Sequence, residues 1–129
     1  MIQSNMLGIP SASAAGVAGL AATGLTATGN SQATALQLAT KSHHVVSTTA
    51  ASTGVILPSA SQPSGGLGTG DRITITNLGA SALAVYPPVG GQIMALGVNA
   101  AFSIPAGKAA EFICTANGAA PTFVAILSA

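Results

Sequence analysis

Only two carboxylates are present in this chain of 129 residues, Asp71 and Glu111, so acid–base chemistry would have to use them. Hydrolysis of a glycosidic bond needs two carboxyl groups that flank the bond to be cleaved. Asp71 directly precedes Arg72 at the start of an alternating stretch, and we expect these two to form a local surface pair. In a second stretch, alternation places Glu111 on the face opposite Phe112. We therefore expect no catalytic carboxylate pair and assign no catalytic residue.

The two histidines, His43 and His44, are adjacent in the sequence. Neighbouring residues of a β-strand point to opposite faces, so this pair does not chelate one metal ion in the simplest geometry. A symmetric oligomer could bring three copies of one histidine to its axis, but an ordinary polar role is favoured. The single cysteine, Cys114, lies in an apolar run, which indicates a buried small hydrophobe. No metal-binding residue is predicted.

Motifs that bind phosphates or activate a nucleophile are missing from the sequence. The glycine-rich stretch 65–70 lacks the lysine and the spacing of a phosphate-binding loop, and there is no G-x-S-x-G elbow. The three bases, Lys41, Arg72 and Lys108, are too scattered to follow a nucleic-acid backbone. Tyr86 could stack on a sugar ring, although a single aromatic at the end of a strand usually serves packing. We expect no cofactor, no cofactor-binding residue, no nucleic-acid partner and no enzymatic activity.

Charged residues make up 4% of the chain, and the formal net charge is +1. An ordinary soluble domain carries about 25% charged residues. Mixed surface charge normally keeps copies of a protein apart, and the cores of protein interfaces are depleted in charge. The alternative explanation of the low charge is a free surface of Ala, Ser, Thr and Gly that is polar enough without charged residues. The composition favours a subunit whose surface is largely covered by partner chains.

Residues 1–33 form a low-complexity arm without a charged side chain. Repeated Gly and β-branched Thr oppose a helix, so we expect an arm that is flexible or extended unless a neighbouring subunit orders it. Its start lacks the basic residues of a secretory signal. Residues 7–29 are long enough to span a bilayer but contain few large aliphatic side chains. Neither a secretory signal nor a membrane span is predicted.

From residue 34 onward, short apolar runs alternate with turn residues, which is typical of β-strands. The expected strands and short extended segments cover residues 34–39, 44–49, 54–57, 71–77, 82–86, 92–96, 101–104, 108–115 and 122–127, with a loop at 59–70. Strands at such spacing, without a helix, favour a sandwich or barrel. The predicted fold is all-β, an antiparallel β-sandwich or jelly roll over residues 34–129 that follows an extended N-terminal arm.

Two of these strands carry further information. Residues 71–77 alternate, with Ile73 and Ile75 on one face, and the short interval to residues 82–86 predicts an antiparallel hairpin. The last strand, 122–127, is apolar on both faces. A strand of this kind is buried on both sides, either within its own domain or by a partner.

The motifs from residue 34 to 129 resemble, in their order and spacing, small structural proteins of tailed bacteriophages. The segments that carry this resemblance are ATALQLA, TGVILP, GDRITITNLGASALAVYPPVGGQI and ALGVNAAFSIPAGKAAEFICT, followed by a short closing strand. The family brings no catalytic residues.

The resemblance implies a virion protein, in particular a capsid decoration or cement protein that is made in the host cytoplasm and lies on the capsid surface. Its partners would be the major capsid protein and further copies of itself, with a trimer favoured over a dimer and no membrane partner. The arm, residues 1–33, would reach a neighbour by adding a strand to an exposed sheet edge. The alternative is a fibre or tail-attachment domain that binds a host surface glycan.

Overall fold

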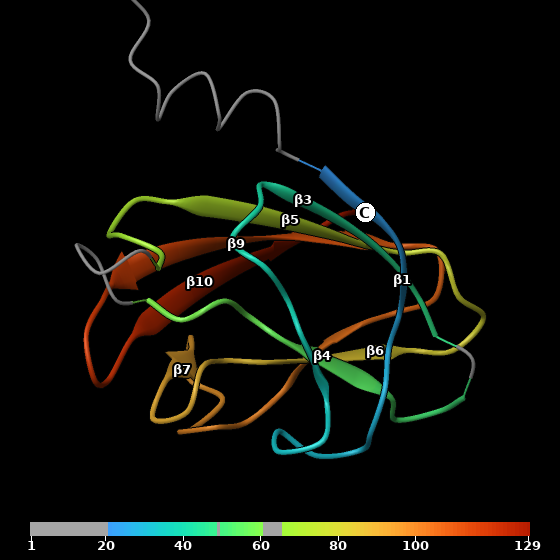
Figure 1. Ribbon diagram of the computed structural model, residues 1–129, viewed down its shortest axis with the longest axis horizontal. Helices are drawn as coiled ribbons and strands as arrows, with labels where there is room; N and C mark the ends of the chain where they lie inside the picture. Colours follow the sequence, from blue (N-terminus) through green and yellow to red (C-terminus); the bar gives the residue numbers. More distant parts are fainter. Residues whose placement is uncertain (1–20, 49, 61–65) are drawn as a thin grey trace, which may run out of the picture.

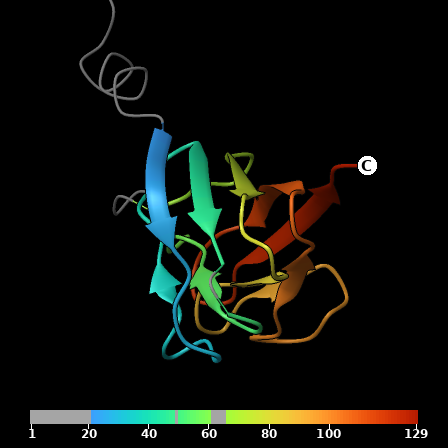
Figure 2. The same ribbon diagram turned by 90° about the vertical axis from the view of Figure 1, so that its right-hand side faces the viewer.

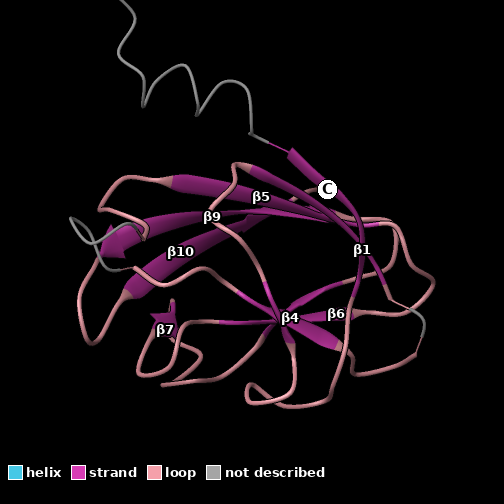
Figure 3. Ribbon diagram, viewed as in Figure 1, coloured by secondary structure: helices cyan, strands magenta, loops and turns pink. Residues whose placement is uncertain are grey.

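Two β-sheets, without a helix, form the part of the chain that the computed structural model describes, residues 21–48, 50–60 and 66–129 (Figure 3). Sheet A has six strands in the order β1-β3-β5-β9-β10-β7, and sheet B has four in the order β2-β4-β6-β8. The strands are β1 Ala21–Thr26, β2 Leu36–Gln37, β3 His43–Ser47, β4 Gly54–Ile56, β5 Arg72–Asn77, β6 Leu83–Tyr86, β7 Gln92–Ile93, β8 Phe102–Ile104, β9 Ala109–Ala116 and β10 Thr122–Leu127. The all-β prediction is confirmed for these residues.

The chain winds between the two sheets, which lie one above the other in Figure 1. From β1 to β6, successive strands alternate between the two sheets, with β1, β3 and β5 in sheet A and β2, β4 and β6 in sheet B. Strands two apart in the sequence therefore become neighbours and pair in parallel, β1 with β3 and β3 with β5 in sheet A, and β2 with β4 and β4 with β6 in sheet B. Figure 2 shows β1 and β3 side by side with the same direction.

Among the later strands, three pairs are antiparallel, β5 with β9, β9 with β10 and β6 with β8, whereas β7 pairs in parallel with β10. Both sheets are therefore mixed, and the expectation of an antiparallel architecture was wrong. The predicted hairpin of residues 71–77 and 82–86 was also wrong, because β5 lies in sheet A and β6 in sheet B. Both segments are strands as expected, but the connection between them crosses from one sheet to the other instead of turning back.

One hydrophobic core lies between the sheets, built from side chains at alternate strand positions. In sheet B, Leu36, Val55 and Val85 occupy one row across β2, β4 and β6, and Val55 and Val85 are fully buried. Phe102 of β8 meets Phe112 of β9 edge-to-face, with ring centroids 5.5 Å apart. Sheet A contributes Ile73, Ile75, Ala110, Cys114 and Phe123. The alternation that predicted Ile73 and Ile75 on one face is confirmed.

The expected boundary between arm and domain at residue 33 does not match the edge of sheet A. Ala21–Thr26 forms the edge strand β1, although its side chains are exposed or half-buried. Backbone pairing with β3 orders this segment, and the Ala27 N–H continues it by donating to the Ser47 carbonyl at 3.0 Å. A strand that is held by backbone pairing and buries little of its side chains leaves no alternation of apolar and polar residues in the sequence. Residues 1–20 of the expected arm lie outside the described residues.

The membrane prediction concerned residues 7–29, of which only the later part is described. None of the described segments forms a helix of the length and hydropathy required to cross a bilayer.

Candidate interaction surface

All five charged residues lie in strands of sheet A or within two residues of their starts. Arg72 and Glu111 are in β5 and β9, Asp71 and Lys108 directly precede these strands, and Lys41 precedes β3. No charged residue occurs between Arg72 and Lys108, a stretch that includes β6, β7 and β8. The charge of the molecule is therefore segregated, and the strands of sheet B carry none.

The charged side chains pair differently from the expectation. Arg72 Nη1 lies 3.0 Å from Glu111 Oε1 across two adjacent strands, whereas the expected pair of Asp71 with Arg72 is not formed. The Asp71 carboxylate instead accepts the Gly68 N–H at 2.8 Å and fixes the turn before β5. Glu111 lies on the face opposite Phe112, as predicted. Because the Arg72–Glu111 pair is solvent-exposed, its contribution to stability is small.

The two histidines point to opposite faces, as the sequence predicted: His43 is exposed and His44 is completely buried. His44 Nε2 lies 3.2 Å from the Lys41 carbonyl oxygen, and its Nδ1 has no partner among the described residues. Burial lowers the pKa of His44 below its ordinary value, and the nearby positive charges of His43 and Lys41 lower it further. The hydrogen bond to the Lys41 carbonyl opposes this shift only in part. His44 is therefore neutral in the folded protein at pH 7.

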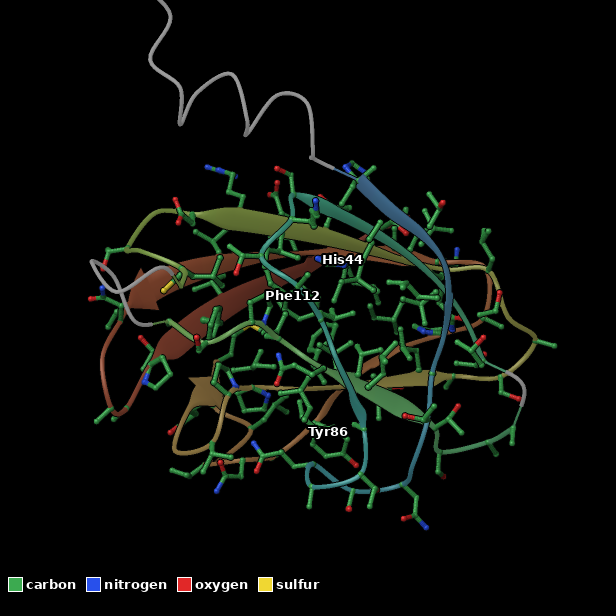
Figure 4. All side chains as sticks on the ribbon, in the orientation of Figure 1. His44, Tyr86 and Phe112 are labelled. Carbon is green, nitrogen blue, oxygen red and sulfur yellow. The ribbon has the colours of Figure 1, made fainter. Side chains whose placement is uncertain are left out.

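Cys114 is buried in the core beside Phe112, as predicted (Figure 4 shows Phe112 and His44 between the sheets). Its thiol donates to the Ala116 carbonyl at 3.4 Å. Burial raises the pKa of the Cys114 thiol, and this outweighs the effect of that hydrogen bond. Within residues 21–48, 50–60 and 66–129, no three His, Cys, Asp or Glu side chains come close enough to hold a metal ion.

The main exposed apolar feature is the connection from β6 to β8, residues 88–100, which we call the apolar loop. Four of its large aliphatic side chains are exposed, by 76% at Val89, 43% at Met94, 46% at Leu96 and 61% at Val98, whereas Ile93 is fully buried in the core. Scattered exposed aliphatics are normal on a protein surface, but several in one short segment indicate an interaction site. The sequence patterns did not predict this loop as an exposed apolar surface. The signal available was a run of aliphatic residues between glycine turns, inside a long uncharged stretch.

The apolar loop is held in place by hydrogen bonds, so its aliphatic side chains are presented in a defined arrangement. Asn99 Oδ1 accepts the Gly90 N–H at 2.7 Å and the Gln32 side-chain amide at 3.1 Å. The Asn99 N–H donates to the Gly91 carbonyl at 2.8 Å. Met94, with φ of 49°, adopts the left-handed conformation that non-glycine residues rarely take. Strain of this kind persists where surrounding contacts impose it, often at functional sites.

Tyr86 lies on the other side of sheet B from the core, as Figure 4 shows. A hollow of about 320 Å³ is found here, lined by Asn30, Ser52, Ala82, Leu83, Ala84, Tyr86 and Ser103. The Tyr86 hydroxyl donates to the Asn30 carbonyl at 3.3 Å. The ring covers Gly54 of β4, where a Cβ atom would lie 2.9 Å from Tyr86 Cε2. Tyr86 therefore packs against the sheet and at the same time lines an uncharged hollow.

Comparison of this chain with protein-family models, with curated proteins and with solved structures finds no match.

Proposed function

We propose that this chain is a structural protein of a tailed-bacteriophage particle, a capsid decoration protein that binds the outside of the icosahedral shell across junctions of major capsid proteins. Its role would be to stabilise the shell against the outward pressure of packaged DNA. The observation that carries this proposal is the segregation of charge: the apolar loop lies within the uncharged stretch between Arg72 and Lys108. The motif order that resembles phage structural proteins gives the class of assembly.

An uncharged surface with exposed aliphatics is suited to permanent burial against another protein. Covering a large aliphatic side chain stabilises a complex by about 1.5–3 kcal/mol when the side chain is fully exposed at the start. The four exposed aliphatic side chains of the apolar loop are between 43% and 76% exposed, so each contributes only part of this. Many weak contacts on one shell add up through multivalency. A decoration protein uses this principle, because several joined copies bind neighbouring capsid subunits.

The two sheets with one core between them support our interpretation of the domain as a β-sandwich with an unusual parallel winding. A jelly roll is built from antiparallel Greek keys, and the parallel pairs β1–β3 and β2–β4 argue against that alternative. We further propose that the chain has no enzymatic activity, that it needs no cofactor, and that its place is on the capsid surface after synthesis in the host cytoplasm. Its partners are the major capsid protein and further copies of itself.

Reconstitution on shells tests the proposal. Purified protein is mixed with DNA-filled particles of the phage that encodes it, after its own copy of the protein has been removed. We expect saturable binding and a higher temperature of DNA release from decorated particles. Absence of binding to shells would contradict the proposal.

The hollow beside Tyr86 favours a second candidate, a fibre or tail-attachment domain that binds a neutral host glycan. An aromatic side chain with the polar residues Asn30, Ser52 and Ser103 around it provides a stacking surface and hydrogen-bonding groups. The Tyr86 ring is already packed on Gly54, which limits the area it offers. Binding of the purified protein to a glycan array, lost in Tyr86→Ala, would favour this candidate over decoration.

A further inference from the structure

One edge of sheet A is open at the second half of β10, Val124–Leu127. The edge strand β7 pairs with β10 only at Thr122 and Phe123. Directly after β7, the Met94 N–H donates to the Phe123 carbonyl at 2.8 Å. Beyond Phe123, no described residue pairs with this side of the strand. Figure 1 shows β10 at the margin of the sheet, with β7 beside one end of it.

The open edge presents unpaired backbone groups. Neighbouring residues of a strand direct their N–H and C=O groups to opposite sides. The Ser128 N–H donates to the Ala109 carbonyl of β9 at 2.8 Å, whereas the Phe123 carbonyl faces β7. Even-numbered residues of β10 therefore bind β9, and Ala125 and Leu127 point their backbone groups outward. Among the described residues, these outward groups of Ala125 and Leu127 have no partner.

The side chains of this edge are apolar and uncovered. Val124, Ile126 and Leu127 are exposed by 39%, 53% and 42%. Native proteins protect an edge with charged residues, proline, a bulge or a covering loop. Residues 124–127 contain no charge and no proline, and the irregularity in the pairing with β9 lies before them, between Thr122 and Phe123. This edge therefore has the properties of a strand that pairs with another chain.

We propose that β10 pairs in antiparallel fashion with β10 of a second copy, about a two-fold axis that passes between the two Ile126 residues. Ala125 of one copy then exchanges hydrogen bonds with Leu127 of the other, which gives about four backbone bonds across the junction. An axis at Ala125 is disfavoured, because it would bring the second copy onto Phe123, which β7 already covers. The two six-stranded sheets merge into one.

The chemistry of the edge selects a second copy as the occupant. A strand with alternating donors and acceptors is complementary to itself under a two-fold rotation. In this register, Ile126 meets its own equivalent as a non-hydrogen-bonded pair on the outer face, where side chains approach most closely. No charged side chain on β10 repels the second copy. This inference deepens the proposed function by naming the contact between copies, a two-fold contact in place of the trimer that was predicted in preference to a dimer. It is tested without a capsid.

A cysteine at the axis provides the test. Cα atoms of a non-hydrogen-bonded antiparallel pair lie about 4.5 Å apart, within the range of about 4.4–6.8 Å that a disulfide requires. We expect purified Ile126→Cys to form a covalent dimer under mild oxidation, with the majority of the chain cross-linked. The native Cys114 is 1% exposed and does not compete. Sedimentation of the unmodified protein should give an even number of copies.

Thr74→Cys is the matched control, since Thr74 lies in the same row of the same face, two strands from the edge. Cross-linking of Ile126→Cys no better than Thr74→Cys overturns the inference, and so does a purely trimeric protein. Loss of association on removal of residues 1–20, with no Ile126→Cys cross-link, would instead assign the edge to the arm of a neighbour. If Ile126→Cys forms no cross-link but the protein still binds shells, the proposed function remains intact and only this inference is refuted.

Discussion

The side chain of Asn77 joins sheet A to sheet B: its Nδ2 donates to the backbone carbonyl of Ile104 at 3.0 Å. The amide is completely buried at the end of β5. Its Oδ1 accepts the Gly79 N–H at 3.0 Å. The Thr48 hydroxyl donates its one proton to the Ser81 carbonyl at 2.6 Å, and its oxygen lies 3.2 Å from Asn77 Oδ1. This network fixes the point at which the chain leaves one sheet and crosses to the other.

Replacing Asn77 by Leu should be strongly destabilising, because the volume is kept while several buried polar groups lose their partners. We expect the free energy of unfolding in urea to fall by about 2–4 kcal/mol. Thr76→Val is the control, as Thr76 lies next to it on the outward face of the same strand. The control should change stability by about 0.5 kcal/mol or less. Equal losses in the two variants would show that the network does not fix the crossing.

His44 should make stability depend on pH. Its folded-state pKa is lowered by burial, so below about pH 6.5 the unfolded chain binds a proton that the folded chain rejects. The free energy of unfolding therefore has its highest value above the ordinary pKa of histidine. It falls as the pH drops from there toward the folded-state pKa of His44. Denaturation in urea between about pH 7.5 and 5.5 measures this fall. His44→Leu should remove it and His43→Gln should keep it, and a fall that survives in His44→Leu would assign the effect to another group.

Alternation in the sequence predicted the position of most strands but not their partners. Ile73 and Ile75 report that one face of β5 is buried, and this is equally true of a strand in a hairpin and of a strand in a parallel winding. The hairpin was predicted from the short interval between residues 71–77 and 82–86, and the alternation gave no reason to reject it. Whether the chain turns back or crosses to the other sheet depends on the contact of Asn77 with Ile104. These two residues are distant in sequence, and local patterns carry no information on such contacts.

The candidate surface was predictable only in part. Low charge indicated a covered surface, but its location required the structure. The Asn99 side chain, next to Val98, accepts the N–H of Gly90, next to Val89, and this contact is not visible in the sequence. Strand β1 was missed since only Ala22 and Leu25 of its six residues are half-buried. The apolar second face of residues 122–127 was visible in the sequence. The structure shows that its side chains Val124 and Ile126 are exposed in the single chain.

The apolar loop should tolerate a charge in the free protein but not on the shell. Val98→Asp places a carboxylate on a side chain that is 61% exposed, so the unfolding temperature should change little. Burying that charge against the capsid is costly, and we expect the affinity for shells to fall at least tenfold. Ala106→Asp adds the same charge in an exposed turn before β9 and should bind normally. Equal binding of both variants would exclude the loop from the interface.

Deletion of residues 1–20 tests the contribution of the arm. Removing residues 1–32 would also remove β1 from the edge of sheet A and would confuse attachment with folding. The shorter deletion should leave the urea denaturation curve unchanged and reduce the number of copies bound per shell. The proposal that the arm reaches a neighbour is based on its uncharged, low-complexity sequence. Unchanged occupancy on shells would refute it.

The most direct test of the decoration proposal is the number of copies of this chain in purified particles, together with its position in particle images. Decoration predicts about one copy for each major capsid subunit or for each junction between capsomers. A particle of ordinary size would then carry hundreds of copies, at repeated positions over the outside of the shell. A dozen copies or fewer, confined to a tail or fibre, would contradict decoration and support the glycan-binding candidate. Complete absence from the particle would contradict both.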